Sequence, residues 1–283
     1  MRVGTVQNLW RYPVKSMRGE TIQTGRVGLN GFAGDRGYAL RDERAGEIRG
    51  AKRLTGLLHC AACYVEQPTE TAIPPAVVTL PDGKTMRTDD LHISATLSQL
   101  LGREVTLWPR QPKENLDHYR RAGFDPDGVR QTFMLEPDEP IPSLEGLPPE
   151  IFEYVSPPGT YFDAFPIHFL TTASLRALSS HHPDGQFVPE RFRPNIVIAT
   201  EDGSTGNVEH TWKGKIIRLG EVELQVEIPT IRCVMTTLPQ GELPKDPKIL
   251  RTVVQQSGRH LGVYASVRHP GEVRVGDPVE VVS

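Results

Sequence analysis

The residue with the clearest chemical potential is Cys233, which follows a run of residues with the pattern of a strand. Its thiolate would be a good ligand for a soft metal or a sulfur-bearing cofactor. Arg232 precedes it, and a neighbouring guanidinium favours the thiolate over the thiol. The alternative is a small core cysteine, because free cysteine is among the most buried residue types. Cys233 is therefore the first candidate for a metal ligand. Other segments of the chain must decide between this role and that of a core cysteine.

The other two cysteines, Cys60 and Cys63, have the spacing of a redox or metal half-site. No second CxxC pair or suitably spaced histidine pair completes it, so the sequence supports a zinc site only weakly. The apolar stretch 57–65 around them has the composition of a strand, in which the two side chains point to opposite faces. We therefore expect both to be structural, and three cysteines do not suggest a secreted disulfide scaffold.

Cationic side chains in the first half of the chain could hold an anion. Lys15 and Ser16 follow the opening strand-like run and offer one cation and one hydroxyl, which suits a phosphate. The alternative is an exposed turn lysine. Arg36 enters an apolar strand directly after Asp35. A buried arginine needs a partner, which is either Asp35 or an anionic ligand.

Two similar groups occur in the second half. Arg193 and Asn195 precede an apolar strand, and arginine can hold phosphate bidentately while asparagine donates to and accepts from a heterocycle edge. Alternatively, Arg193 pairs with a local acid such as Glu190. Thr172 and Ser174 lie at a predicted helix start, where hydroxyls and free N–H groups either cap the helix or bind an oxyanion.

Composition bounds the class of protein. The chain has 283 residues and a net charge of −3, which argues against a bulk preference for nucleic acid but leaves room for a local cationic pocket. No apolar run approaches the roughly 20 residues that a membrane span needs. The first ten residues lack the apolar core of a signal peptide. We expect a cytoplasmic protein that does not associate with membranes or nucleic acid.

Short apolar runs separated by turn signals predict a mainly β (α+β) chain with a few helices. The clean alternation at 222–228 predicts a half-buried strand. Helices are predicted at 94–101, with Ser94 as a possible N-cap, at 172–180, and at 247–257. The segment 137–166 contains eight prolines in 30 residues, a composition that cannot sustain a helix or a central strand. We interpret it as a connection with a domain boundary near residue 150.

These segments, in this order, resemble the MOSC-domain proteins. They are most similar to the branch with an N-terminal MOSC β-barrel domain, which includes the mitochondrial amidoxime-reducing components and their bacterial relatives. The matching segments are Tyr-Pro-Val-Lys-Ser at 12–16, Asp-Arg at 35–36, Phe-Arg-Pro-Asn-Ile-Val at 192–197, Arg-Cys-Val-Met-Thr-Thr at 232–237 and Val-Gly-Asp-Pro-Val at 275–279. Each segment is short, but the ordered set is specific and covers nearly the whole chain.

The resemblance implies two β-barrel-like domains with a few helices. The expected division is an N-terminal MOSC β-barrel domain at 1–115, a connecting segment at 116–150 and a MOSC domain at 151–283. We expect a cofactor cleft between the domains, because Lys15 and Arg36 come from one half and Arg193 and Cys233 from the other.

The resemblance also implies a molybdenum cofactor, in which molybdenum is held by a pterin dithiolene and one protein cysteine. Cys233 matches that cysteine, and is thereby the implied catalytic and metal-binding residue. Lys15, Ser16 and Arg36 match positions that contact the pterin or its phosphate. Further cofactor-contacting positions fall on or beside Thr172, Ser174, Arg193, Asn195 and Arg232.

The implied function is a molybdenum-dependent oxidoreductase that reduces N-hydroxylated or N-oxide compounds by oxygen-atom transfer. The chain shows no four-cysteine ferredoxin-like domain, so we expect electrons from a separate donor, a ferredoxin or a cytochrome b5-like protein with its reductase. We also expect no N-terminal membrane anchor. The alternative is a carrier or sulfur-transfer protein for sulfurated cofactor, with Cys233 as the persulfide or docking residue. A metal-free β-barrel binding module is the third hypothesis. His168 is a candidate general acid only through its proximity in the chain to Thr172.

Overall fold

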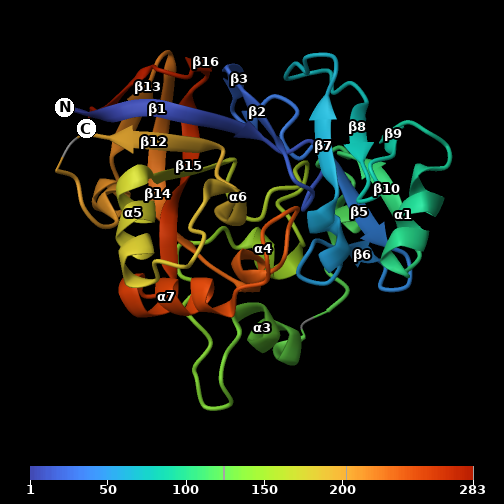
Figure 1. The fold of residues 1–283 in the computed structure, drawn as a ribbon. Coiled ribbons are helices and arrows are strands. Elements are labelled where there is room, and N and C mark those ends of the chain that lie inside the picture. Colours follow the sequence, from blue (N-terminus) through green and yellow to red (C-terminus); the bar gives the residue numbers. More distant parts are fainter. Residues whose placement is uncertain (124, 202, 283) are drawn as a thin grey trace.

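Strands dominate the computed structural model, which describes residues 1–123, 125–201 and 203–282, and seven of them close into a barrel (Figure 1). The mainly β fold predicted from the sequence is confirmed. In order around the barrel, the strands are β12 (Ile196–Thr200), β11 (Ile167–Thr171), β15 (His260–His269), β14 (Val222–Ile231), β13 (Ile216–Leu219), β17 (Pro278–Val281) and β1 (Arg2–Arg11), which pairs back with β12. The short β2 (Glu20–Ile22) continues from β1.

The barrel closes because its interior is apolar and its first strand can approach the last. Along β14 the inward positions Val222, Leu224 and Val226 are fully buried, which confirms the alternation predicted there. β1 and β12 pair antiparallel, with Gly4 opposite Thr200. A Cβ added at Gly4 would collide with the carbonyl oxygen of Ala199, so a glycine is needed at this closing pair.

A second lobe holds two three-stranded sheets around its own core. Its elements are β5 (Tyr38–Asp42), β6 (Glu47–Ile48), η1 (Thr55–His59), β7 (Ala61–Tyr64), β8 (Ala76–Thr79), β9 (Thr85–Arg87), α1 (Ile93–Leu101) and β10 (Val105–Pro109). A third small sheet pairs β16 (Gly271–Arg274) with β3 (Thr24–Gly28), which pairs in turn with β4 (Gly31–Phe32). The ranges 1–115, 116–150 and 151–283 remain a proposed division, which strand pairing crosses at β1 and β3.

The helices cover the barrel and the space between the lobes (Figure 1). α5 (Thr172–His181) and α7 (Pro247–Ser257) lie against the barrel; α2 (Leu116–Tyr119), α3 (Pro126–Phe133), α4 (Glu150–Glu153), α6 (Pro189–Phe192), η2 (Val208–Trp212) and η3 (Val234–Thr237) are short. The prediction of α7 is confirmed, because Pro247 opens it and Gly258 ends it in the left-handed conformation. Among the described residues, no helix combines the length and the hydropathy needed to cross a bilayer.

Three local predictions were wrong. Ser94 is not the N-cap of α1, which begins at Ile93; its hydroxyl instead accepts a hydrogen bond from the backbone N–H of Leu107. The expected strand at 57–65 begins only at Ala61, because η1 occupies the residues before it. The proline-rich connection does contain one helical turn, α4, since proline is tolerated at a helix start.

Candidate functional site

A cavity of about 820 Å³ lies between the lobes, and it collects most of the residues singled out from the sequence. Its lining includes Lys15, Ser16, Arg36, His168, Arg193, Asn195, Arg232 and Cys233. Most of these residues come from loops of the two lobes and His168 comes from β11, although up to 218 positions separate them in the chain. The volume falls within the range of roughly 300–1,000 Å³ that is usual for ligand pockets.

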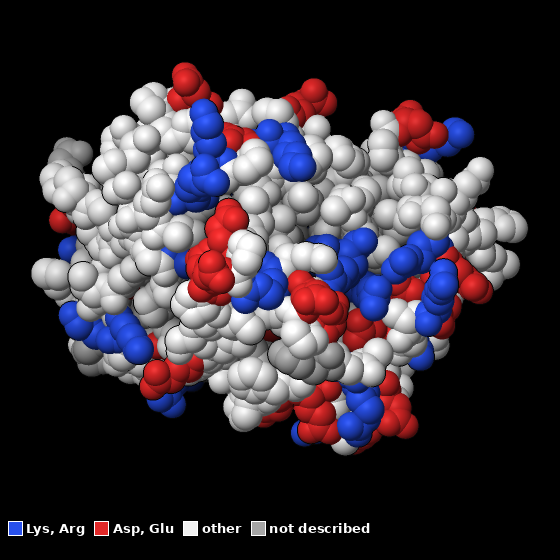
Figure 2. Space-filling model, turned by 90° about the horizontal axis from the view of Figure 1, so that it is seen from below, with Lys and Arg blue, Asp and Glu red and all other residues white. Residues whose placement is uncertain are grey.

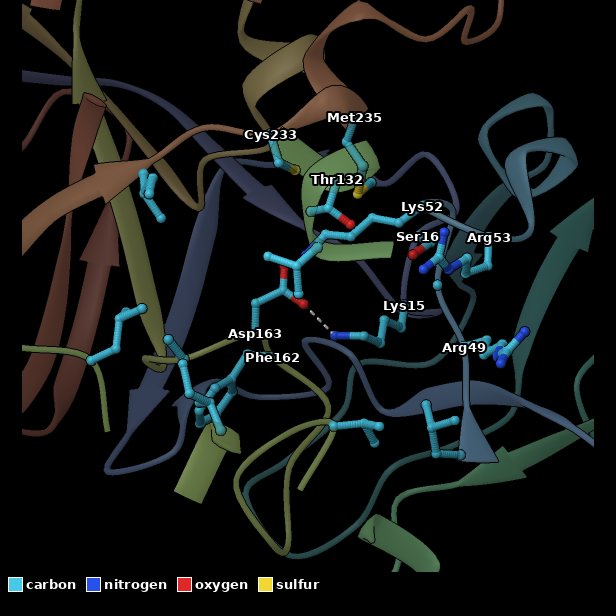
Figure 3. A pocket seen from close by; sticks show the side chains of 18 of the residues that line it. Lys15, Ser16, Arg49, Lys52, Arg53, Thr132, Phe162, Asp163, Cys233 and Met235 are labelled. Atoms are coloured by element: carbon cyan, nitrogen blue, oxygen red, sulfur yellow. Dashed lines mark hydrogen bonds and ion pairs between the residues drawn. The ribbon is translucent and has the colours of Figure 1, made fainter. Parts of the chain in front are cut away.

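Cys233 lies just after the end of the barrel strand β14 and directly before η3, where the chain passes toward the second lobe. Its side chain is half-buried and lines the pocket, and Figure 3 shows it beside Met235. The residues that follow it, Met235 and Leu238, pack against the core of the second lobe. The segment therefore bridges the two lobes and holds the thiol at their junction.

Arg232 fixes the backbone before Cys233. Its Nε and Nη2 donate to the carbonyl of Leu261 at 2.9 and 2.7 Å, and its Nη1 donates to the carbonyl of Phe192 at 3.1 Å. Its Nη2 also donates to Nε2 of His168. Burial lowers the pKa of Arg232 to about 10. Most of its donors are thus committed within the protein, so it positions Cys233 more than it offers a grip to a ligand.

His168 is held as a neutral ring and is not suited to donate a proton. Its Nε2 accepts from Arg232, while its Nδ1 donates to the backbone carbonyl of Arg193 at 3.3 Å. Burial, and then the charge of Arg232, lower the pKa of His168 well below its usual value. The geometry therefore argues against the general-acid role considered for it, and gives it the task of joining two loops of the pocket.

Lys15 reaches across the junction to a residue that the sequence did not single out, Asp163. Its Nζ donates to Oδ1 of Asp163 at 2.6 Å and to the carbonyl of Tyr161 at 2.7 Å (Figure 3). Burial lowers the pKa of Lys15, although Asp163 opposes this shift. Although desolvation in the pocket opposes ionisation, the charges of Lys15 and Lys52 hold the pKa of Asp163 well below its ordinary range. The pocket thus carries a fixed ion pair.

Ser16 and Arg36 flank this ion pair from the second lobe. The Ser16 hydroxyl accepts from the backbone N–H of Ala51 at 2.9 Å and keeps its own hydrogen free to donate. Arg36 pairs with Asp35, which confirms the structural partner proposed from the sequence. The guanidinium of Arg36 also lies 4.9 Å from the ring centroid of Tyr12.

Asn195 links the two halves of the site. Its Nδ2 donates to Asp35 at 3.0 Å, and its Oδ1 accepts from the backbone N–H of His168 at 3.1 Å. The same Asp35 carboxylate accepts from the backbone N–H of Tyr12 at 2.8 Å. The amide is therefore engaged in holding β11 against the turn before β5 that carries Asp35, although it lines the pocket.

Arg193 differs from the other cations of the described pocket lining because one of its unpaired donors is buried. Its guanidinium lies 4.3 Å from the ring centroid of Tyr12, and its Nη1 donates to the carbonyl of Met17 at 2.8 Å. Its Nη2 is buried without a hydrogen-bond partner among the described residues. Burial lowers the pKa of Arg193 to about 10. No ion pair with Glu190 occurs in the described part of the chain, so that alternative is not supported.

Backbone strain marks the same positions. Ser16, Arg36 and Arg193 have φ values of 72°, 48° and 54°, in the left-handed region that non-glycine residues rarely adopt. Only two other non-glycine residues of the described chain, Met134 and Arg259, share this feature. Such conformations cost roughly 1–3 kcal/mol each and concentrate at functional sites. Three separate loops are thus constrained to present these side chains.

Thr172 and Ser174 do not line the pocket, in contrast to the other predicted residues. The hydroxyl of Thr172 accepts from the backbone N–H of Thr200 at 3.2 Å. The backbone N–H of Ser174 donates to the capping hydroxyl of Thr171, and its own hydroxyl donates to the buried carboxylate of Glu209 at 2.5 Å. These contacts are those of a helix start, which was the alternative role considered for both residues.

We expect Ser174→Ala to reduce stability without affecting ligand binding at the pocket. The substitution removes a donor to Glu209, whose pKa is raised by burial, and an unsatisfied buried group costs about 1–3 kcal/mol. Urea denaturation of the variant measures this loss. Ser180→Ala, on the same helix but exposed, is the control and should be nearly neutral. A Ser174→Ala protein of unchanged stability that failed to retain a pocket ligand would contradict this assignment.

Sequence reasoning missed a basic loop, Arg49-Gly50-Ala51-Lys52-Arg53, whose cations line the pocket (Figure 3). The negative charge of a Cys233 thiolate, with a further contribution from Asp163, raises the pKa of Lys52. A Cβ added at Gly50 would lie 2.6 Å from the hydroxyl oxygen of Ser16, so glycine permits this close approach. The sequence did contain a signal for this loop, because three of its five residues are cations and one is a glycine.

Positive charge is concentrated in the pocket. Nine lysine and arginine residues and three acidic residues belong to its described lining, whereas the whole chain has a net charge of −3. On the outer face in Figure 2, basic and acidic side chains are interspersed. This distribution favours a small anion bound inside the pocket over a long polyanion bound outside.

Comparison with known proteins adds family matches to this geometry. The family model described as the MOSC N-terminal beta barrel domain matches residues 3–109, and that described as the MOSC domain matches residues 158–280. Mitochondrial amidoxime reducing component 2 of Rattus norvegicus is 28% identical over 302 residues, covering 98% of this chain and 83% of the relative. Mitochondrial amidoxime-reducing component 1 of Homo sapiens is 27% identical over 305 residues, with the same coverages. Molybdenum cofactor sulfurase of Drosophila grimshawi is 37% identical over 118 residues, covering 39% of this chain and 14% of that protein.

Proposed function

Because the chain belongs to the MOSC-domain proteins, we propose that it binds a molybdenum cofactor in the pocket and reduces N-hydroxylated or N-oxide compounds. The observation that carries the proposal is that Cys233 shares one cavity with cations from the other lobe. A thiolate beside several fixed cations suits a ligand that combines a soft metal with an anionic group.

The residues of the pocket fit such a group. Cys233 would ligate the molybdenum, since its thiolate is a soft and anionic donor, whereas the thioether of Met235 in the same lining is neutral. Arg193 supports the fit most directly, because an anionic partner would satisfy its buried Nη2 and offset the cost of burying its charge. Lys15, Ser16 and Arg36 would contact the pterin or its phosphate.

Other predicted residues receive different roles in this proposal. Arg232 and Asn195 position the loops that carry the binding groups, because their own polar atoms are largely engaged within the protein. Thr172 and Ser174 maintain the start of α5. Lys52 would place a positive charge beside the anionic ligand, since it lines the same cavity as Cys233.

The proposed reaction breaks an N–O bond. An amidoxime, two electrons and two protons give an amidine and water. The bound cofactor would supply the two-electron chemistry, while the protein orients the substrate and controls charge and water around it. We propose that the electrons come from a separate donor protein, a ferredoxin or a cytochrome b5-like protein with its reductase, and that the protein works in the cytoplasm.

Turnover tests the proposal against its alternative. Protein produced in a host that makes molybdenum cofactor should convert benzamidoxime to benzamidine when a reduced viologen dye supplies electrons. The similarity to part of a molybdenum cofactor sulfurase favours a second candidate, a carrier or sulfur-transfer protein in which Cys233 is the persulfide or docking residue. Molybdenum-loaded protein that delivers cofactor to an apo-enzyme but shows no turnover would support the carrier and contradict the reductase.

A further inference from the structure

Part of the pocket lining consists of apolar side chains from the proline-rich connection. We call these residues the apolar wall: Ile141, Leu144, Leu147, Ile151 and Phe152. Two of them are unusually accessible for their type, since Ile141 is 45% exposed and Phe152 is 62% exposed. Accessible apolar groups gathered in a cavity often mark a ligand-binding surface.

The apolar wall is held in place at both ends. Before it, Arg259 donates to the carbonyl of Phe133 at 2.6 Å and to the carboxylate of Glu139 at 2.8 Å. After it, Nη2 of Arg121 donates to the carbonyls of Ile151 and Tyr154 at 3.0 and 3.1 Å. These contacts fix the backbone of the segment that carries the wall. Its exposed side chains therefore form an ordered surface.

The middle of the wall rests on the barrel. Gly146 has a φ of 82°, and a Cβ added there would lie 2.8 Å from Cγ2 of Ile228 on β14. The chain can therefore approach the barrel closely between Leu144 and Leu147 only with glycine at this position. Contact with β14, which leads to Cys233, places the wall on the same cavity as the thiol.

The pocket lining combines cations with apolar side chains. In Figure 3 the cations Arg49 and Arg53 lie on one side, while Phe162 lies on the other. The cations of the lining suit the anionic part of the cofactor, whereas the side chains of the apolar wall suit a ligand with apolar groups. A volume of about 820 Å³ is near the upper end of the usual range, so it can accommodate a second small molecule beside the first.

We propose that the apolar wall binds the hydrocarbon part of the substrate, so that among N-hydroxylated compounds the protein favours those with an aromatic or branched alkyl group next to the reducible nitrogen over those with a methyl group there. This inference rests on the proposed function. A small amphipathic molecule is the occupant because the wall faces the cavity that holds Cys233. The hydrocarbon group on the wall would leave the N–O group directed toward the polar side.

Substrate discrimination tests the inference. We expect wild-type protein to reduce benzamidoxime with a kcat/KM at least about 10-fold above that for acetamidoxime, which has a methyl group in place of the phenyl ring. Phe152→Ala combined with Leu144→Ala should lower this ratio by about 10-fold, mainly by raising the KM for benzamidoxime. Both residues are partly or largely exposed, so the variant should fold. Leu91→Ala, at a 95% exposed site outside the pocket lining, is the matched control.

A binding measurement separates failure of this inference from failure of the proposed function. Calorimetric titration with benzamide, which has the phenyl group but no N–O bond, should detect binding to wild type and a loss of about 10-fold in affinity in the double variant. Benzamide binding without turnover of either amidoxime would contradict the proposed reductase activity, but it would still support the wall as a binding surface. An equal kcat/KM ratio in wild type and variant, or a variant that changes only the KM for the electron donor, would overturn the inference.

Discussion

Replacement of Cys233 by serine is expected to abolish benzamidoxime reduction, with a loss of at least about 100-fold, and to leave the fold intact. Serine offers a hard oxygen in place of the soft thiolate, and changes in the outer shell of a metal site alone typically cost 10- to 100-fold. The side chain of Cys233 is half-buried and makes no capping hydrogen bond. Stability should therefore change by no more than about 0.5 kcal/mol. Steady-state turnover and urea denaturation measure the two effects.

Cys63→Ser is the matched control, because Cys63 is exposed on β7 and lies outside the pocket lining. It should retain wild-type turnover. The molybdenum signal in electron paramagnetic resonance provides a further readout, which should differ between Cys233→Ser and wild type and be unchanged in Cys63→Ser. Full activity in Cys233→Ser would show that the thiol is not a metal ligand.

Substitution of Arg193 by glutamine should weaken retention of the cofactor by about 10- to 100-fold. The variant removes a buried cation whose Nη2 has no partner among the described residues, and a hydrogen bond to a charged group contributes roughly 1.5–3 kcal/mol. An anionic ligand would be that partner in the loaded protein. Molybdenum and pterin content after extensive dialysis measure retention directly.

Two further variants separate charge from packing at this position. Arg193→Lys keeps the charge but not the planar group that lies over Tyr12, so it should recover retention only in part. Arg268→Gln removes an exposed arginine outside the pocket lining and should behave as wild type. If Arg193→Gln kept its cofactor as well as Arg268→Gln does, Arg193 would have a purely structural role.

Local sequence patterns were sufficient to predict the structure where a short segment determines its own conformation. Pro247 and Gly258 define α7 because each fits one end of a helix and no other part of it. Cys60 is buried and Cys63 exposed, but only Cys63 lies on a strand, because Cys60 ends η1. The start of α1 was misjudged because the Ser94 hydroxyl satisfies a backbone group of β10, a tertiary contact that no local pattern records.

In the candidate site, too, local sequence patterns identify some residues but not those that tertiary packing brings in. Lys15, Arg36, Arg193 and Cys233 could be found because each polar side chain stands next to an apolar strand, where its presence is unusual. Asp163 could not, because it lies within the proline-rich connection, and only the packing of that connection brings it to Lys15. The roles of Arg232 and His168 depend on one hydrogen bond between residues 64 positions apart.

The central claim is that Cys233 and the cationic loops hold a molybdenum cofactor. The most direct test is the molar ratio of molybdenum to protein, measured by mass spectrometry on wild type purified from a host that makes the cofactor. The account predicts a ratio near one, together with an equivalent amount of the pterin released on denaturation. Well-folded wild-type protein that contains neither molybdenum nor pterin would contradict it and leave the metal-free binding module as the function of the pocket.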